Sequence, residues 1–205
     1  MNNSKKSATD LTLYNQFAEV VLQLVSSIPK SDENISEHPQ KRAKDIAAIA
    51  SLKASAVSGT LALPPGPLGM LTIIPDLIAV WKIQAQMVVD MAAAYGKTAD
   101  LNREVMLYCL FKQAASQVVR DLVVRTGERF LIKRTSLRTI QTILQKIGVK
   151  VTQRVAGKGI ARWLPIIGAM GVAAYAYYDT DSVAKSAIEL FNGDITIDKT
   201  EVETD

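Results

Sequence analysis

Few side chains in this sequence have the types and spacing that catalysis requires. His38 is the only histidine and lies in the polar segment KSDENISEHPQ, so a Ser-His-Asp or Cys-His arrangement would depend on a solvated imidazole. Cys109 is the only cysteine and sits among apolar residues, which favours a small buried hydrophobic side chain over a nucleophile. Cysteine and histidine do not occur at metal-binding spacing. We therefore predict no catalytic residues and no enzyme activity.

Two short motifs imitate ligand sites without the residues that such sites need. Gly96-Lys97-Thr98 resembles the end of a phosphate-binding loop, but Met91 stands where that motif requires its first glycine. Asp179-Thr180-Asp181 could begin a cation site, but Val183 and Lys185 follow where oxygen ligands would be needed. We interpret the second motif as a helix cap, and we predict neither a metal nor another cofactor.

Asp76, Asp90 and Glu104 are the acids that a converging active site would use. Asp76 has the most distinctive context, because it directly follows the uncharged residues 54–75. A carboxylate there either caps the helix that follows Pro75 or, if the uncharged run enters lipid, is a functional acid. We keep an enzyme with an unrecognised site as the least favoured of three hypotheses, and the other two are given at the end of this section.

The uncharged residues 54–75 are the stretch around which the other elements are organised. At their centre, Pro64, Pro65, Gly66, Pro67 and Gly69 cannot continue one helix, because proline removes a backbone donor and glycine favours turns. We predict two short apolar arms around a bend. Such a hairpin either packs in a helical core or dips into a bilayer without crossing it.

A second uncharged run, residues 163–178, contains one proline and two glycines and is too short for a transmembrane helix. We predict a second bent hairpin here, followed by the cap and a final helix that ends before Gly193. The hairpin residues that we expect to contact a membrane or a partner are Leu63, Pro64, Pro65, Gly66, Pro67, Leu68, Gly69, Leu71, Trp163, Pro165 and Gly168.

Apolar residues at helical spacing predict a helix over 10–28, a polar linker, a helix from Pro39 and a central helix over 76–95. The central helix has one narrow polar stripe, so we expect it to be buried. Further segments follow at roughly 100–125, 128–134 and 136–147. We predict an all-α fold with two Pro/Gly-bent apolar hairpins around the central buried helix. Its parts are an N-terminal helix and linker (1–38), one helical domain (39–192) and an acidic disordered tail (193–205).

Charge is distributed unevenly along the chain. Residues 103–162 hold thirteen lysines or arginines against three acids, whereas residues 163–205 hold two against eight. A basic band of this kind is either a solvated helical face or a surface that binds anionic lipid. A nucleic-acid site is the third alternative and has less support, because few aromatic residues are available to stack on bases. The residues that we expect to bind an anionic surface are Arg120, Arg125, Arg129, Lys133, Arg134, Arg138 and Arg162.

The two hairpin regions together resemble the EcsC family of bacterial proteins. The similarity lies in LPPGPLGMLTIIPDLIAVWKIQAQMVVDMAAAYG (Leu63–Gly96) and in RWLPIIGAMGVAAYAYYDTDSVAKSAIELF (Arg162–Phe191), which match the family's apolar turns and following helices. The resemblance implies a helical, membrane-associated protein with no established reaction. This chain departs from the family at Ala174-Tyr175 and Tyr177-Tyr178, where smaller or amide-bearing residues are usual.

Our leading hypothesis is therefore a non-enzymatic, peripheral or monotopic membrane-associated protein that meets an anionic membrane surface or a membrane protein. Trp81, Trp163, Tyr175, Tyr177 and Tyr178 would suit the interface if they are exposed. A lone cysteine and the absence of a clean signal peptide favour the cytoplasm, at the inner face of the cell membrane. The alternative is a soluble helical module that binds a protein partner through the same apolar turns.

Overall fold

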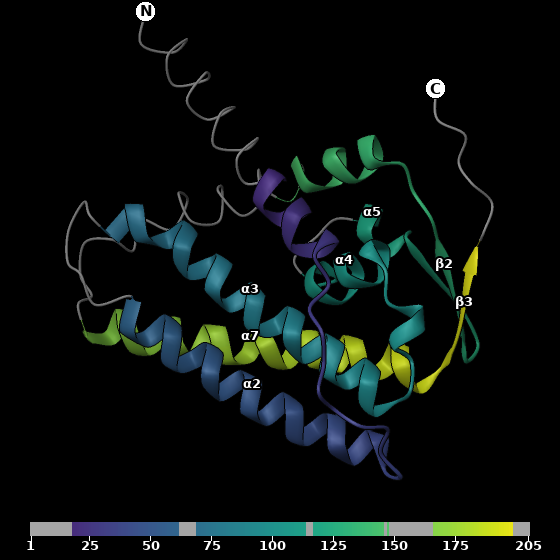
Figure 1. Ribbon diagram of the computed structural model, residues 1–205. Helices are drawn as coiled ribbons and strands as arrows, with labels where there is room; N and C mark the ends of the chain where they lie inside the picture. The colour runs from purple at the N-terminus through teal and green to yellow at the C-terminus, as the bar shows by residue number, and fades with distance from the viewer. Residues whose placement is uncertain (1–17, 62–68, 114–116, 146, 148–165, 199–205) are drawn as a thin grey trace, which may run out of the picture.

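The computed structural model describes residues 18–61, 69–113, 117–145, 147 and 166–198. Its framework is three long helices, α2 (Pro39–Leu61), α3 (Gly69–Ala94) and α7 (Ile166–Asn192), which pack on one another (Figure 1). α2 begins at Pro39, as predicted, since proline is favoured in the first turn of a helix. α3 stops just before Gly96, whose φ of 70° suits the end of a helix. The two helices flank residues 62–68, so the arms predicted around the first bend are helical.

Shorter elements surround one half of this three-helix bundle. They are helical residues 18–26 and 137–145, the 3-10 turn η1 (Thr98–Asp100), α4 (Arg103–Phe111) and α5 (Gln117–Arg120) (Figure 1). The side chain of Asn102 caps α4 by accepting a hydrogen bond of 2.9 Å from the backbone N–H of Val105. The main hydrophobic core lies in this half, and Phe111, Phe130 and Phe191 are among its largest fully buried side chains.

α3 is the buried central helix that its composition predicts. Trp81 is 6% exposed and packs edge-to-face on Phe111, with ring centroids 5.4 Å apart. Its narrow polar stripe faces the linker between residues 27 and 38. Gln86 donates a 2.9 Å hydrogen bond to the carbonyl of Lys30, and Ser31 donates one of 2.7 Å to Asp90.

The fold is mainly helical rather than all-α, because it includes a three-stranded sheet. β1 (Val123–Thr126) and β2 (Arg129–Lys133) form an antiparallel hairpin, and β3 (Asp194–Asp198) pairs in parallel with β2. The predictions of a helical segment at 128–134 and of disorder at 194–198 are wrong. Residues 194–198 alternate apolar and polar residues, a strand pattern, and Phe130 and Ile132 of β2 are buried on one face between exposed Arg129 and Lys133. Gly127 with φ of 63° allows the tight turn between β1 and β2.

Two predicted helix starts are also wrong. α7 is one continuous helix through Gly168 and residues 179–181, so residues 166–178 form no bent hairpin and the Asp179–Asp181 motif is no cap. α3 begins at Gly69, which places Asp76 beyond its first turn rather than at its start, so Asp76 does not cap it. Proline and glycine can bend a helix without ending it, and here local signals of termination were overridden by packing.

Candidate functional site

The two predicted apolar stretches lie at the same end of the three-helix bundle. The C-terminus of α2 and the N-termini of α3 and α7 come together there, at the end opposite to the sheet (Figure 1). Ala54, Val80 and Ala176 form a small buried cluster between these helices. We call the part of the bundle beyond this cluster (residues 54–61, 69–79 and 166–175) the apolar end. Asp76 is its one charged residue.

Several predicted contact residues can be placed at this end and others cannot. Gly69 is the first residue of α3, Leu71 follows in the same helix, and Gly168 lies in the first turn of α7. The remaining predicted contact residues, Leu63–Leu68, Trp163 and Pro165, lie outside the described residues, as does Arg162.

Small residues form the contact between α2 and α7 inside the apolar end. A Cβ atom placed on Gly59 would lie 3.5 Å from the Cβ of Ala173, and Ser58 on α2 is buried. Small residues let helix backbones approach closely, which is the way helices pack inside membranes, where lipid supplies no hydrophobic drive.

Large apolar and aromatic side chains are exposed near the buried cluster. On α7, Val172 is 38% exposed, Tyr175 57% and Tyr178 69%. On α2, Ile49 is 50% exposed and Leu52 63%. Single exposed apolar residues are ordinary, but a group of them beside an uncharged helix end is typical of an interaction surface.

The aromatic residues proposed for an interface divide into two groups. Tyr175 and Tyr178 are exposed and Tyr177 is half-buried, whereas Trp81 belongs to the core. Trp163 lies outside the described residues. The interfacial role considered for Trp81 is therefore excluded by its burial.

A polar layer crosses the bundle one helical turn from the Ala54–Val80–Ala176 cluster. The amide nitrogen of Gln84 on α3 donates hydrogen bonds to Asp179 Oδ2 at 2.9 Å and Thr180 Oγ1 at 3.1 Å on α7. Gln84 and Thr180 are fully buried, and so is Ser51 on α2. A glutamine among apolar positions, off the polar stripe of its helix, is the sequence signal that could have revealed this layer.

Two of the acids considered for an active site, Asp90 and Glu104, are engaged in separate structural roles. A polar cleft of about 450 Å³ lies between the linker, α2 and α3, and Asp90 lines it together with Glu33 and Arg42, which form an ion pair. Glu104 is buried elsewhere and accepts a 3.1 Å hydrogen bond from the backbone N–H of Thr135. Within the described ranges, no group of histidine, cysteine and acidic residues is arranged to hold a metal ion.

Cys109 is expected to be inert in the folded protein. Its side chain is 1% exposed, and burial raises the pKa of its thiol to about 12, so the thiolate is scarce at neutral pH. We expect a water-soluble disulfide reagent to modify Cys109 at least about 100-fold more slowly in native protein than in urea-unfolded protein. Absorbance of the released thiolate measures this, and equal rates would contradict the burial.

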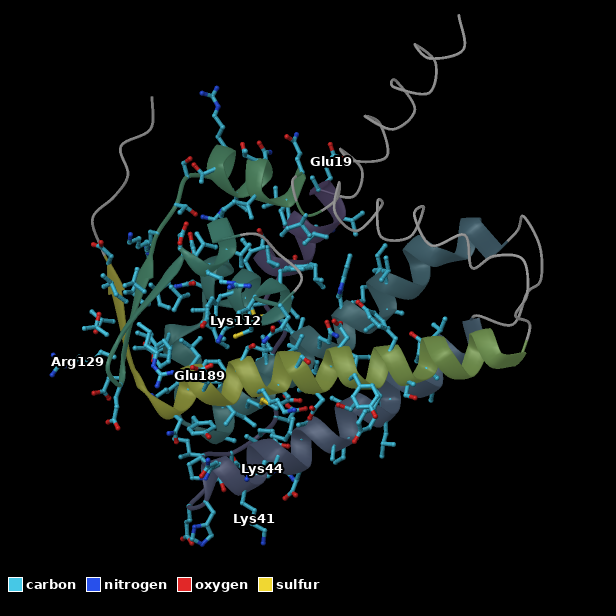
Figure 2. The ribbon with its side chains drawn as sticks, turned by 180° about the vertical axis from the view of Figure 1, so that it is seen from behind. Glu19, Lys41, Lys44, Lys112, Arg129 and Glu189 are labelled. Atoms are coloured by element: carbon cyan, nitrogen blue, oxygen red, sulfur yellow. The ribbon has the colours of Figure 1, made fainter. Side chains whose placement is uncertain are left out.

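The described part of the basic band does not lie beside the apolar end. α5, β1 and β2, which carry Arg120, Arg125, Arg129 and Lys133, lie at the opposite end of the bundle (Figures 1 and 2). Arg134 and Arg138 are exposed and follow β2 directly. Among the described residues, the apolar end and these basic side chains therefore lie at different ends of the molecule.

Acids from the end of the chain offset part of this band. Glu189 on α7 forms ion pairs with Lys112, at 2.8 Å, and with Arg125 (Figure 2). Parallel pairing of β2 with β3 places Asp194 opposite Arg129 and Asp198 opposite Lys133. Opposite charges at such positions attract each other across strands, so the acids of residues 189–198 lie against the basic residues of β1 and β2.

The Glu189 ion pairs predict a pH-dependent contribution to stability. The hydrogen bond from Lys112 holds the pKa of Glu189 below its ordinary 4.5. Because the folded-state pKa is the lower one, the contribution is present above about pH 4.5 and is lost as the pH falls through the folded-state value. We expect Glu189→Gln to lower the urea midpoint at pH 7 and to have little effect at pH 3. An equal loss at both pH values would contradict this.

One stretch of the described chain is long and apolar enough to cross a membrane. It is Leu77–Ala94 in α3, with a mean hydropathy of 1.3. However, 61% of it is buried inside the protein, and core helices of soluble proteins pass the same test. Its length and composition are therefore weak support for a membrane span.

Comparison with known families decides which group of proteins this arrangement belongs to. The pattern of the EcsC protein family matches residues 9–192, which include all three long helices and both apolar stretches. The chain belongs to the EcsC protein family. No curated protein and no solved structure matched it. The EcsC match ends at the last residue of α7, so β3, which completes the sheet, lies outside the family pattern.

Proposed function

We propose that this EcsC protein is a non-enzymatic, peripheral or monotopic membrane-associated protein whose apolar end enters the bilayer. We place it at the inner face of the cell membrane. The observation that carries the proposal is that the C-terminus of α2 and the N-termini of α3 and α7 lie at one end of the bundle, with Asp76 as the one charged residue there. Loops of soluble proteins cover such ends with polar residues, whereas residues 62–68 and 163–165 are without charge.

The packing and surface of the apolar end support insertion. Its helices approach through Gly59 and Ala173, a contact that needs no large core side chains. Tyr175 and Tyr178 are exposed beside it, and tyrosine is enriched where membranes meet water. Burial of the apolar side chains of these helix ends in hydrocarbon would supply the favourable free energy of binding, against the cost of Asp76.

Vesicle flotation tests this function with neutral and anionic vesicles at low and high salt. We expect the protein to float with both kinds of vesicle and to stay bound at high salt, because salt screens charges but leaves apolar insertion intact. Flotation only with anionic vesicles, lost in high salt, would shift the contact to charged residues. No flotation under any of these conditions would contradict the proposal.

A protein partner is the second candidate, and exposed Ile49 and Leu52 on α2 favour it. They lie one helical turn apart and present an apolar strip that a partner helix could cover. If the protein does not float, we expect Leu52→Asp to abolish capture of such a partner while the fold is unchanged.

A further inference from the structure

We propose that Lys53, Lys82, Tyr175 and Tyr178 form a collar that binds lipid headgroups and sets the insertion depth at about one leaflet. This inference rests on the proposed insertion of the apolar end and adds its orientation, its depth and the lipid groups it contacts. The bundle then enters end-on, and the basic band at the sheet takes no part in binding.

The collar is defined by its level along the bundle. Ala54, Val80 and Ala176 pack together, so they mark one cross-section through α2, α3 and α7. Lys53 is adjacent to the first of these residues, Lys82 lies two positions from the second, and Tyr175 and Tyr178 flank the third. All four side chains are exposed. Each of the three helices therefore contributes at least one cationic or phenolic side chain at the same level.

The distances from this level to the helix ends agree with the thickness of one leaflet. With a rise of about 1.5 Å per residue, the helices extend beyond the cluster by about 10 Å in α2, 16 Å in α3 and 15 Å in α7. Half of the hydrocarbon core of a bilayer is about 15 Å thick. The bundle is too short beyond the cluster to cross, and long enough to fill the near leaflet.

The charges at the collar are free to meet phosphate groups. Among the residues whose side chains the structure describes, Lys53 and Lys82 form no ion pair, and two acids of α7 have other partners. Asp179 accepts a hydrogen bond from Gln84, and Asp181 pairs with Lys185 at 2.7 Å. Lysine at this level can extend its amine to the headgroups while its methylene chain lies along apolar surface.

The interior of the bundle changes at the same place. On the membrane side of the collar, α2 and α7 pack through small residues. On the other side lie the polar layer around Gln84 and then the main core with its large side chains. A buried polar layer would be poorly placed in the middle of a leaflet, whereas its position just above the collar keeps it within the water-exposed part of the protein.

The test compares two double variants in vesicle-binding titrations. Lys53→Gln/Lys82→Gln removes the charges of the collar, and Arg134→Gln/Arg138→Gln removes the same number from exposed positions beyond the sheet. A lysine near an anionic surface strengthens binding by about fivefold, so we expect the collar variant to bind anionic vesicles about 25-fold more weakly at low salt. The control should change by less than about threefold, and both should bind neutral vesicles like the parent protein.

Each outcome of this test separates the collar from the proposed function. If the parent protein floats but the collar variant loses no more affinity than the control, the collar is wrong and apolar insertion stands. If the parent protein binds no vesicle, both the collar and the proposed insertion of the apolar end are wrong. Circular dichroism shows that the variants keep their helices, and all four positions are exposed, so loss of folding is not expected.

Discussion

Replacing Trp81 by alanine is expected to lower the free energy of unfolding by about 3–5 kcal/mol, the usual cost of deleting a buried indole. The ring is 6% exposed and meets Phe111 edge-to-face at 5.4 Å, so alanine would leave a cavity between α3 and α4. The measurement is chemical unfolding followed by circular dichroism, because removal of Trp81 changes the fluorescence signal itself.

Trp81→Phe is the matched control for this effect. Phenylalanine keeps an aromatic ring in the contact with Phe111 and should lose much less stability than alanine. If Trp81 were a membrane anchor, alanine would instead weaken vesicle binding and leave the unfolding curve unchanged. That result would contradict the burial of α3 as the central helix of the bundle.

Replacing Leu68 and Leu71 together by aspartate is expected to reduce binding to neutral vesicles by at least about 100-fold. Each aspartate costs up to about 3 kcal/mol in the hydrocarbon core, and less toward the headgroups. Leu68 directly precedes α3 in the sequence, and Leu71 lies in the first turn of that helix. Vesicle titration measures the loss, and the far-ultraviolet circular dichroism spectrum should be unchanged.

Val124→Asp/Leu137→Asp is the control for this variant. Both side chains are exposed large hydrophobic residues, at 37% and 53%, and they belong to the half of the molecule that holds the sheet. We expect this pair to bind vesicles like the parent protein. Loss of helical structure in Leu68→Asp/Leu71→Asp would show instead that the first apolar turn is part of a core.

The long helices were predictable because local signals mark their ends. Pro39 begins α2, and Gly96, with its positive φ, follows the end of α3. The narrow polar stripe of α3 also indicated a buried helix. In the structure, Gln86 and Asp90 of this stripe form hydrogen bonds with Lys30 and Ser31 of the linker. The local signals at the start of α2 and the end of α3 were therefore interpreted correctly, whereas those for the starts of α3 and α7 were not.

The sheet and the course of α7 depend on contacts between distant residues. β2 pairs with β3 about sixty positions later in the chain, a partner that no local pattern identifies. Asp179 and Thr180 looked like a helix start because such residues often cap helices, but Gln84 on α3 satisfies them in the middle of α7.

The candidate site was predictable in composition but not in arrangement. The apolar turns could be recognised as two separate stretches, whereas their convergence at one end follows from the packing of α2, α3 and α7. The basic residues were conspicuous in the sequence, but several of them meet acids such as Glu189 at the other end of the molecule. Lys53 and Lys82 belong to no charge cluster and become noticeable only at one level of the bundle.

The most direct test of insertion is the depth of a fluorescent label on α2. Ala56→Cys and Ala48→Cys replace two exposed alanines of this helix, one on each side of the collar, while buried Cys109 stays unlabelled. With vesicles, we predict that a nitrobenzoxadiazole label at position 56 is quenched by nitroxides in the acyl chains. The label at position 48 should stay accessible to a quencher in water. Equal quenching from water at both positions would contradict the insertion of the apolar end.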